Sequence, residues 1–149
     1  MASEAVNSAT MREWRDLGFY YDRDDIGRAW RLIGSRAGLL RFKEALLQFA
    51  ADPRNAGISE HEHFGPYMYL EVMTWPEPGF DDHAIRGPLT ELARLAQLIE
   101  TKLTEAPPGS LIEIREEFSP SAPYSLILDV RGDGFDPAKA DPALPDEVR

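Results

Sequence analysis

The sequence predicts an α+β fold, in which a mostly antiparallel sheet of about six strands carries two helices on one face, in the order ββαββαββ. Three observations favour this fold. Two segments, 35–51 and 88–106, repeat apolar residues at helical spacing. Short segments rich in aromatic, branched or alternating residues lie before and after each of them. Turn-forming residues divide these short segments into pairs, as in β-hairpins.

Residues 17–33 are predicted to form the first hairpin. Residues 17–21 are aromatic, residues 28–33 read as a second strand, and the turn formers of 22–27 lie between them. The first helix then begins at Ser35, a residue type whose hydroxyl caps exposed backbone N–H groups. It is expected to end before Asp52-Pro53, because proline cannot continue a helix.

The second half of the chain repeats this plan. Residues 58–63 and 67–75 are predicted strands, and 79–86 are expected to be irregular apart from a short extended piece at 83–85. The second helix begins at Gly87-Pro88 and ends at the prolines of 107–108. Two last strands, 111–118 and 124–131, form the final hairpin.

The two helices and the hairpins that follow them are similar enough to suggest a duplicated unit. The second strand of each hairpin begins with Pro-Tyr, at 66–67 and 123–124, and carries an apolar–acidic–Val step, at 70–72 and 128–130. This pattern favours a helix–hairpin pseudo-duplication, with chance agreement of a few residues as the alternative.

The chain length of 149 residues fits a single domain. We expect loose tails at about 1–12 and 136–149, because the first is small and polar without a period and the second is rich in Asp, Pro and Ala. Phe135 and Leu144 are expected to pin the second tail to the body. No secretory signal and no membrane-spanning apolar run is recognisable, which predicts a cytoplasmic protein with no membrane contact.

Composition excludes several function classes. There are 16 Lys and Arg against 26 Asp and Glu, a net charge of −10, which argues against nucleic-acid binding and favours basic partners. The chain has no cysteine, so disulfides, thiolate metal sites and a cysteine nucleophile are excluded. No nucleophile elbow or complete phosphate-binding loop is present, so we predict no catalytic residues and no cofactor.

An open sheet face is the predicted interaction surface, because helices on one face leave the other uncovered. Its outward side chains are a mixture of aromatic and charged residue types that protein interfaces favour. They are Arg31, Tyr67, Tyr69, Glu71, Trp75, Arg115 and Arg131. The alternative is a solvated face with cross-strand ion pairs, as between Glu113 and Arg131. Unprotected sheet edges also predict that a homodimer can form.

The histidines are the best candidates for metal chemistry. Alternate residues of a strand share a face, so His61 and His63 are expected to lie together about 7 Å apart, a spacing that can bind one zinc ion. The remaining histidine, His83, follows the partner strand and supplies a third ligand in this hypothesis. The alternative is a polar strand end and loop that bind no metal.

A small, acidic, cysteine-free α+β chain without a catalytic signature resembles the immunity proteins of bacterial toxin systems. Two motifs, Glu-His-Glu-His-Phe-Gly at 60–65 and Asp-Gly-Phe-Asp-Pro at 133–137, are similar to those of a bacterial protein family without an assigned activity. Immunity proteins bind and neutralise a toxin, often a basic nuclease. The resemblance therefore implies a bacterial cytoplasmic protein with a basic protein partner, and it assigns no functional residue.

Three functions follow as hypotheses. The favoured one is a non-catalytic protein-binding module that uses the open sheet face or the acidic second half of the chain. The second is a metal-binding protein or metal-dependent hydrolase that uses the three histidines. The third is a small-ligand binder with an apolar pocket between a helix and the sheet, near Trp30 and Arg36.

Overall fold

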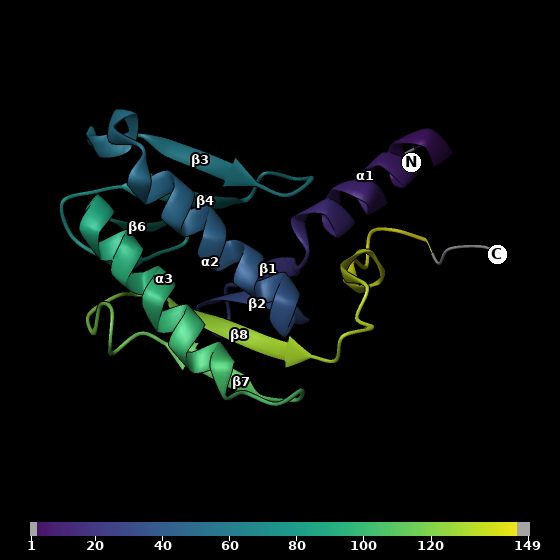
Figure 1. Ribbon diagram of the computed structural model, residues 1–149. Coiled ribbons are helices and arrows are strands. Elements are labelled where there is room, and N and C mark those ends of the chain that lie inside the picture. Colours follow the sequence, from purple (N-terminus) through teal and green to yellow (C-terminus); the bar gives the residue numbers. More distant parts are fainter. Residues whose placement is uncertain (1–2, 146–149) are drawn as a thin grey trace.

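The computed structural model describes residues 3–145 and confirms the α+β class. In this part of the chain there are three α-helices, two short 3-10 helices and eight strands (Figure 1). The helices are α1 (Glu4–Leu17), α2 (Arg36–Ala51), η1 (Pro53–Ala56), α3 (Leu89–Thr104) and η2 (Pro137–Ala140). The strands are β1 (Tyr20–Asp24), β2 (Ala29–Ser35), β3 (His61–Phe64), β4 (Leu70–Thr74), β5 (Gly79–Phe80), β6 (Ile85–Gly87), β7 (Leu111–Ile114) and β8 (Ser125–Arg131).

The prediction of one mostly antiparallel six-stranded sheet is wrong. The described strands form two four-stranded mixed sheets, in the orders β1-β2-β8-β7 and β3-β4-β6-β5. In each sheet two antiparallel hairpins meet through a parallel central pair, β2 with β8 and β4 with β6. The prediction failed because it paired hairpins that follow one another in sequence. Instead, α2 carries the chain from the first sheet into the second, and α3 carries it back.

Three predicted hairpins are confirmed, and a fourth was missed. The pairs β1–β2, β3–β4 and β7–β8 are antiparallel, as expected. The region predicted to be irregular contains the hairpin of β5 and β6, which are two and three residues long. Strands this short do not show alternation in a sequence, so only their pairing defines them. The expected order ββαββαββ therefore lacks this hairpin.

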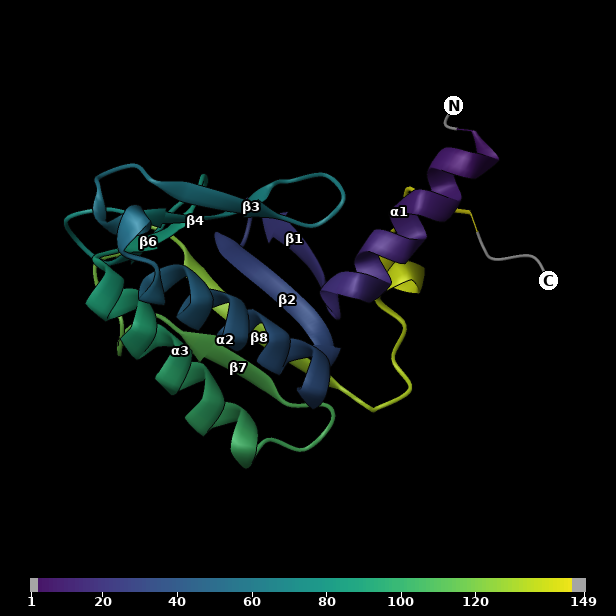
Figure 2. The same ribbon diagram turned by 45° about the horizontal axis from the view of Figure 1, so that its top comes forward.

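Helices α2 and α3 lie side by side across one side of the sheets (Figure 2). As predicted, Ser35 caps α2, and its hydroxyl accepts a hydrogen bond from Gly38 N at 3.1 Å. At the same end, the Arg36 guanidinium donates to the carbonyls of Leu103 and Ala106, at the end of α3. A cation that binds the last carbonyls of a helix satisfies them and stabilises the helix dipole. None of the described helices is long and apolar enough to cross a membrane.

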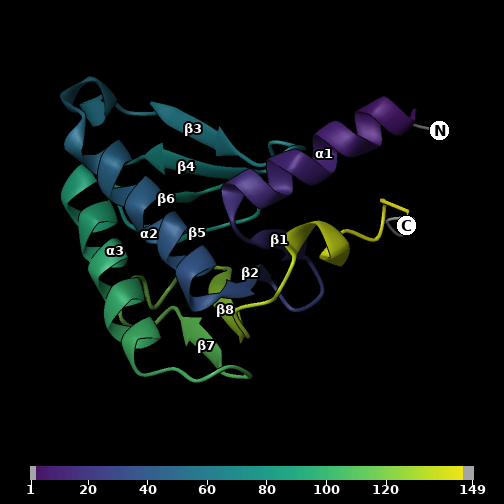
Figure 3. The same cartoon turned by 45° about the vertical axis from the view of Figure 1, so that its right-hand side comes forward.

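The expectation of a loose tail at about 1–12 does not fit the structure, because α1 occupies most of that segment. Ser3 caps α1 through a hydrogen bond from Val6 N, and Gly18 ends it in a left-handed conformation. Trp14 is its only fully buried residue, and Met11 and Leu17 pack against the core as partly buried side chains, so the apolar stripe of this helix is short and set among polar residues. Figure 3 shows α1 beside η2, the 3-10 helix of the second predicted tail.

The second tail, expected at about 136–149, is ordered as far as it is described. Phe135 and Leu144 pack against the main hydrophobic core, as predicted. Between them, Pro137 and Ala138 of η2 are buried, and Asp141 is 4% exposed. Residues 146–149 of this predicted tail, and residues 1–2 of the first, lie outside the described part of the chain.

Candidate aromatic binding site

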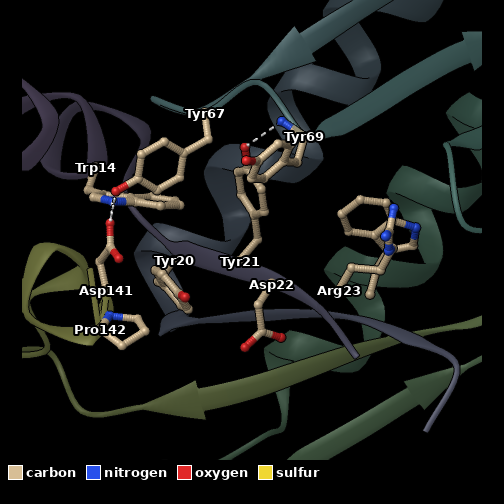
Figure 4. Close-up of a pocket in the computed structure, with 10 residues that line it drawn as sticks. Trp14, Tyr20, Tyr21, Asp22, Arg23, Tyr67, Tyr69, Asp141 and Pro142 are labelled. Carbon is tan, nitrogen blue, oxygen red and sulfur yellow. Dashed lines mark hydrogen bonds between the residues drawn. The ribbon is translucent and has the colours of Figure 1, made fainter. Parts of the chain in front are cut away.

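A pocket of about 490 Å³ lies where α1, β1 and the segment 141–142 meet the loop that follows β3 (Figure 4). We call it the aromatic cleft, because four tyrosines and two tryptophans form most of its wall. The lining residues are Trp14, Tyr20, Tyr21, Asp22, Arg23, Trp30, Tyr67, Tyr69, Asp141 and Pro142. Its volume and its apolar wall with few polar groups are typical of ligand-binding sites.

Trp14 is the centre of this wall. Its ring lies 4.8 Å from the ring of Tyr20, 5.1 Å from that of Tyr21 and 5.9 Å from that of Tyr67, measured between centroids. These are the separations of favourable edge and tilted aromatic pairs. Trp14 is 1% exposed, so the single buried residue of α1 fixes that helix to the body of the molecule.

Asp141 joins three segments that are far apart in the sequence. Its Oδ2 accepts hydrogen bonds from Trp14 Nε1 at 2.9 Å and from the Tyr67 hydroxyl at 2.5 Å. Its Oδ1 accepts a third from Ala143 N at 2.9 Å. Burial and the bond to Asp141 raise the pKa of Tyr67 above its ordinary value. This carboxylate therefore fixes α1, the β3–β4 loop and the C-terminal segment in one arrangement.

Tyr21 holds the loop between β3 and β4. Its hydroxyl donates to the carbonyl of Phe64 and accepts from Tyr69 N at 3.2 Å. Gly65 permits this contact, because a Cβ there would lie 2.5 Å from the Tyr21 ring, and its φ of 83° suits glycine. Burial raises the pKa of Tyr21, which keeps the hydroxyl protonated and able to donate.

Tyr20 differs from its neighbours in the cleft wall. It is 9% exposed, and its hydroxyl makes no hydrogen bond with any residue that the structure describes. Burial, and then the carboxylates of Asp22 and Asp141, raise the pKa of Tyr20 to about 12. The Asp22 carboxylate is engaged by Arg31, with Nε–Oδ1 at 2.8 Å and a second contact at 2.5 Å. The Tyr20 hydroxyl is thus free to bind another molecule.

The rim of the cleft is exposed and apolar. Tyr67 is 37% exposed, Met68 57% and Tyr69 68%, so three consecutive large side chains face solvent. Met68 has a φ of 61°, a conformation that residues other than glycine seldom adopt. The hydrogen bonds of Tyr21 and Asp141 on either side hold the loop in this conformation. The exposed rim is therefore positioned before any partner arrives.

The predicted interaction surface is divided between the two sheets. Arg31 and Arg131 belong to the first sheet and Arg115 directly follows its edge strand, whereas Glu71 belongs to the second sheet and Trp75 follows its strand β4. Only Tyr67 and Tyr69, from the β3–β4 loop, line the aromatic cleft.

The charged members of that surface are paired locally. Arg131 binds Asp129 at 2.8 Å on its own strand, rather than Glu113 across the sheet. Arg115 donates to the carbonyl of Ala122 at 3.0 Å. Cross-strand pairing, the alternative in the sequence, occurs between Arg31 and Asp22, which are register partners of β2 and β1.

The structure brings two of the three histidines together. The rings of His61 and His63 lie 5.0 Å apart, and each Nδ1 bonds a nearby carbonyl, of Ser59 and Met68. His63 also lies 3.7 Å from Glu71 on β4. His83 is in the loop before β6, next to Asp82. No group of three or more candidate ligands in the described residues is arranged to hold a metal ion.

We call the outer side of the second sheet, with His61, His63, Glu71, Met73 and Arg86, the histidine face. The strand register places His61 opposite Met73, His63 opposite Glu71, and Met73 opposite Arg86. Arg86 binds Asp81 at 2.5 Å and lies over the Trp75 ring at 5.3 Å.

The sequence pointed to part of the cleft and missed the rest. Trp30 lines it and donates from Nε1 to the Asp81 carbonyl at 2.7 Å, whereas Arg36 is engaged with the end of α3. Trp14, Tyr20 and Asp141 were not predicted as site residues. The aromatic run at 19–21 was a signal for Tyr20, but nothing near Asp141 indicates that its partners are Trp14 and Tyr67.

Comparison with known proteins gives no match, neither to a protein-family model nor to a curated protein or a solved structure. The functional conclusion therefore depends on the geometry of this chain. The aromatic cleft offers ring faces for stacking, a free hydroxyl and a buried carboxylate. These are groups that bind and orient another molecule.

Proposed function

We propose that this protein is a non-catalytic binding module that docks a protein partner through the aromatic cleft and its rim. The observation that carries the proposal is the exposed run of Tyr67, Met68 and Tyr69 at the edge of a preformed aromatic pocket. Tyrosine and methionine are enriched in the centres of protein interfaces, and pockets next to them receive anchoring side chains.

The rim is fixed, which favours binding. Tyr67 is held by Asp141, and the backbone of Tyr69 is held by the Tyr21 hydroxyl. A loop already held in one conformation loses little conformational entropy when a partner binds it. Its exposed apolar area therefore contributes to affinity without a large ordering cost.

The charge of the chain favours a basic partner. At a net charge of −10 the protein attracts basic surfaces and repels nucleic acid and anionic membranes. An immunity-like role in the bacterial cytoplasm, in which the partner is a basic toxin, is part of this proposal. It is supported by the acidity and by the general resemblance of the sequence to immunity proteins.

A small-ligand binder is the second candidate function. The volume of about 490 Å³ lies within the usual range for small-molecule pockets, and the wall combines aromatic side chains with a few polar groups. This candidate predicts a ligand that fills the cleft while Met68 and Tyr69 stay exposed. The protein-binding proposal instead requires the rim to become buried.

Affinity capture tests the protein-binding proposal. It uses three immobilised baits: the wild-type protein, Tyr69→Ala and Leu111→Ala. Leu111 is the matched control, because it is 72% exposed and lies on β7, at the opposite edge of its sheet from β1. The retained protein is then purified, and its dissociation constant is measured by calorimetry for each bait. We expect Tyr69→Ala to weaken binding at least about tenfold, and Leu111→Ala to leave it unchanged.

A partner that binds the Tyr69→Ala variant as tightly as wild type would show that the rim is not the docking surface. Thermal melts of both variants accompany the affinity measurement. Since Tyr69 is 68% exposed, both variants should melt close to the wild-type temperature. Size-exclusion chromatography with light scattering on the same samples shows whether the rim instead joins two copies of this chain.

A further inference from the structure

Asp141 is a buried carboxylate that forms no ion pair with any cation among residues 3–145. It is 4% exposed, and its three hydrogen-bond donors, Trp14, Tyr67 and the backbone of Ala143, are all neutral groups. Among residues 3–145 it forms no salt bridge. Buried acidic groups are ordinarily paired with a cation, and in the same cleft even the half-buried Asp22 is paired with Arg31. Within residues 3–145 this carboxylate is therefore stabilised by neutral donors alone.

The Tyr20 hydroxyl, unlike Asp141, has no hydrogen-bond partner among residues 3–145. Nine-tenths of Tyr20 is buried, its side chain lines the cleft, and no described residue accepts from or donates to its hydroxyl. Asp22 and Asp141, which line the same pocket (Figure 4), both act on it electrostatically. An accessible hydroxyl on the pocket wall, with two carboxylates acting on it, is positioned to accept a hydrogen bond from a cationic N–H donor.

The cations near the cleft are already engaged. Arg23 binds Asp25 at 2.6 Å and the Asp82 carbonyl at 2.7 Å, and Arg31 is occupied by Asp22. The charged lining residues are two aspartates and one arginine, so the wall carries a formal charge of −1. The remaining wall is mostly aromatic, and aromatic ring faces attract cations.

We propose that the aromatic cleft receives a basic side chain of the protein partner, a guanidinium or ammonium group that stacks on the aromatic wall and hydrogen-bonds to Tyr20. This inference rests on the proposed function and specifies the chemistry of the docked residue. A long basic side chain suits the site, because its apolar stem can lie along the tyrosine rim while its charged head reaches Asp141.

The test is a titration with a blocked tripeptide, acetyl-Gly-Arg-Gly-amide, followed by the indole N–H signals in an NMR spectrum. The chain has three tryptophans: Trp14 and Trp30 line the cleft, and Trp75 lies under Arg86 outside it. We expect saturable shifts for Trp14 and Trp30 and none for Trp75, which is an internal control. Low ionic strength is used, because salt screens the attraction.

The matched probe replaces arginine with citrulline, which has the same shape and no charge. We expect the citrulline peptide to bind at least about tenfold more weakly, since it loses both the cation–π attraction and the charge attraction. The lysine peptide should behave like the arginine peptide, and its Nε-acetylated form like citrulline.

Two variants separate the contributions of the named groups. Tyr20→Phe removes only a hydroxyl that has no partner, so it should fold normally and weaken the arginine peptide about threefold to tenfold. Asp141→Asn removes the charge and should remove most of the preference for arginine over citrulline. Asp133→Asn, at an exposed position outside the cleft, changes the net charge equally and should leave binding unchanged.

The inference is overturned if arginine and citrulline peptides bind equally, if only Trp75 shifts, or if no indole signal shifts up to millimolar peptide. Because Tyr20→Phe keeps the fold, the inference can be decided even if Asp141→Asn unfolds. Equal binding of both peptides, combined with a partner that Tyr69→Ala releases, would overturn this inference and leave the proposed function standing. A partner that binds the Tyr69→Ala variant as tightly as it binds wild type would instead contradict the proposed function.

Discussion

The aromatic cleft and the histidine face differ in where their polar groups find partners. On the histidine face, partners are local: His61 bonds the Ser59 carbonyl, and Arg86 binds Asp81. In the cleft, Trp14 and its acceptor Asp141 are 127 residues apart, and Tyr67 lies 74 residues from the same carboxylate.

The two regions also differ in what they leave open. The polar groups of the histidine face are bonded to their neighbours. Within the part of the chain that the structure describes, the cleft retains an unbonded Tyr20 hydroxyl and a carboxylate that pairs with no cation. A conspicuous sequence motif therefore does not identify the region best suited to bind. A polar group that lines a pocket and is not bonded within the described chain is the stronger indication, because it stays available to another molecule.

Trp14→Ala should give the largest effect. It removes a side chain that is 1% exposed, packs against three tyrosines and donates to Asp141. We expect the free energy of unfolding, measured with urea, to fall by about 3–5 kcal/mol. The control is Trp75→Ala, at a half-buried position, with an expected loss of about 1–2 kcal/mol. Equal losses would mean that the cleft is no better packed than the surface around the histidine face.

Asp141→Ala should give the second largest loss of stability. It leaves the Trp14 indole N–H and the Tyr67 hydroxyl without their acceptor, which should lower the free energy of unfolding by about 2–3 kcal/mol. Asp129→Ala is the matched control, since its partner Arg131 is 46% exposed and the expected loss is below about 1 kcal/mol. If the two aspartates contributed equally, Asp141 would not fix the three segments of the cleft.

Tyr20 should make the fold sensitive to alkali. Because its pKa is raised from 10.0 to about 12, the unfolded chain ionises first as the pH rises, and unfolding then releases a proton. This contribution is complete below pH 10 and is lost between about pH 10 and 12, for a loss of roughly 2–3 kcal/mol.

Ultraviolet titration of wild type and Tyr20→Phe measures this directly. The difference between the two curves belongs to Tyr20 and should have its midpoint near pH 12. The variant should also lose less stability than wild type over the same pH range, although Tyr21 and Tyr67, whose pKa values are also raised, still contribute. A midpoint near 10 would show that Tyr20 is solvated rather than buried in the cleft wall.

Substitutions on the histidine face should change the free energy of unfolding least. The double variant His61→Ala, His63→Ala removes two exposed rings with local hydrogen bonds, so the free energy of unfolding should change by less than about 1 kcal/mol. Equimolar zinc should hardly shift the melting temperature, because two imidazoles without a third ligand bind zinc weakly. A rise of several degrees that the double variant abolishes would make this face a zinc site and reverse the comparison.

Local signals predicted much of the fold. The hydroxyl of Ser35 and the Asp52-Pro53 step mark the ends of α2 within one or two residues, because capping and chain breaking act between close neighbours. The helix α1 was missed, since its apolar residues Met11, Trp14 and Leu17 form only a short stripe in a segment of small and polar residues. The candidate site was only partly predicted: Tyr67 and Tyr69 were named for the wrong reason, as members of an open sheet face.

The sequence by itself determined the α+β class, helices α2 and α3, three hairpins and the acidic charge, because periodicity, turn residues and composition are local properties. Only the tertiary structure decided that the hairpins form two sheets through parallel central strands, and that Trp14, Tyr20, Tyr67 and Asp141 meet in one cleft. Those contacts join residues far apart in the chain. Their free energy depends on burial and bonding in the folded state, which no local pattern encodes.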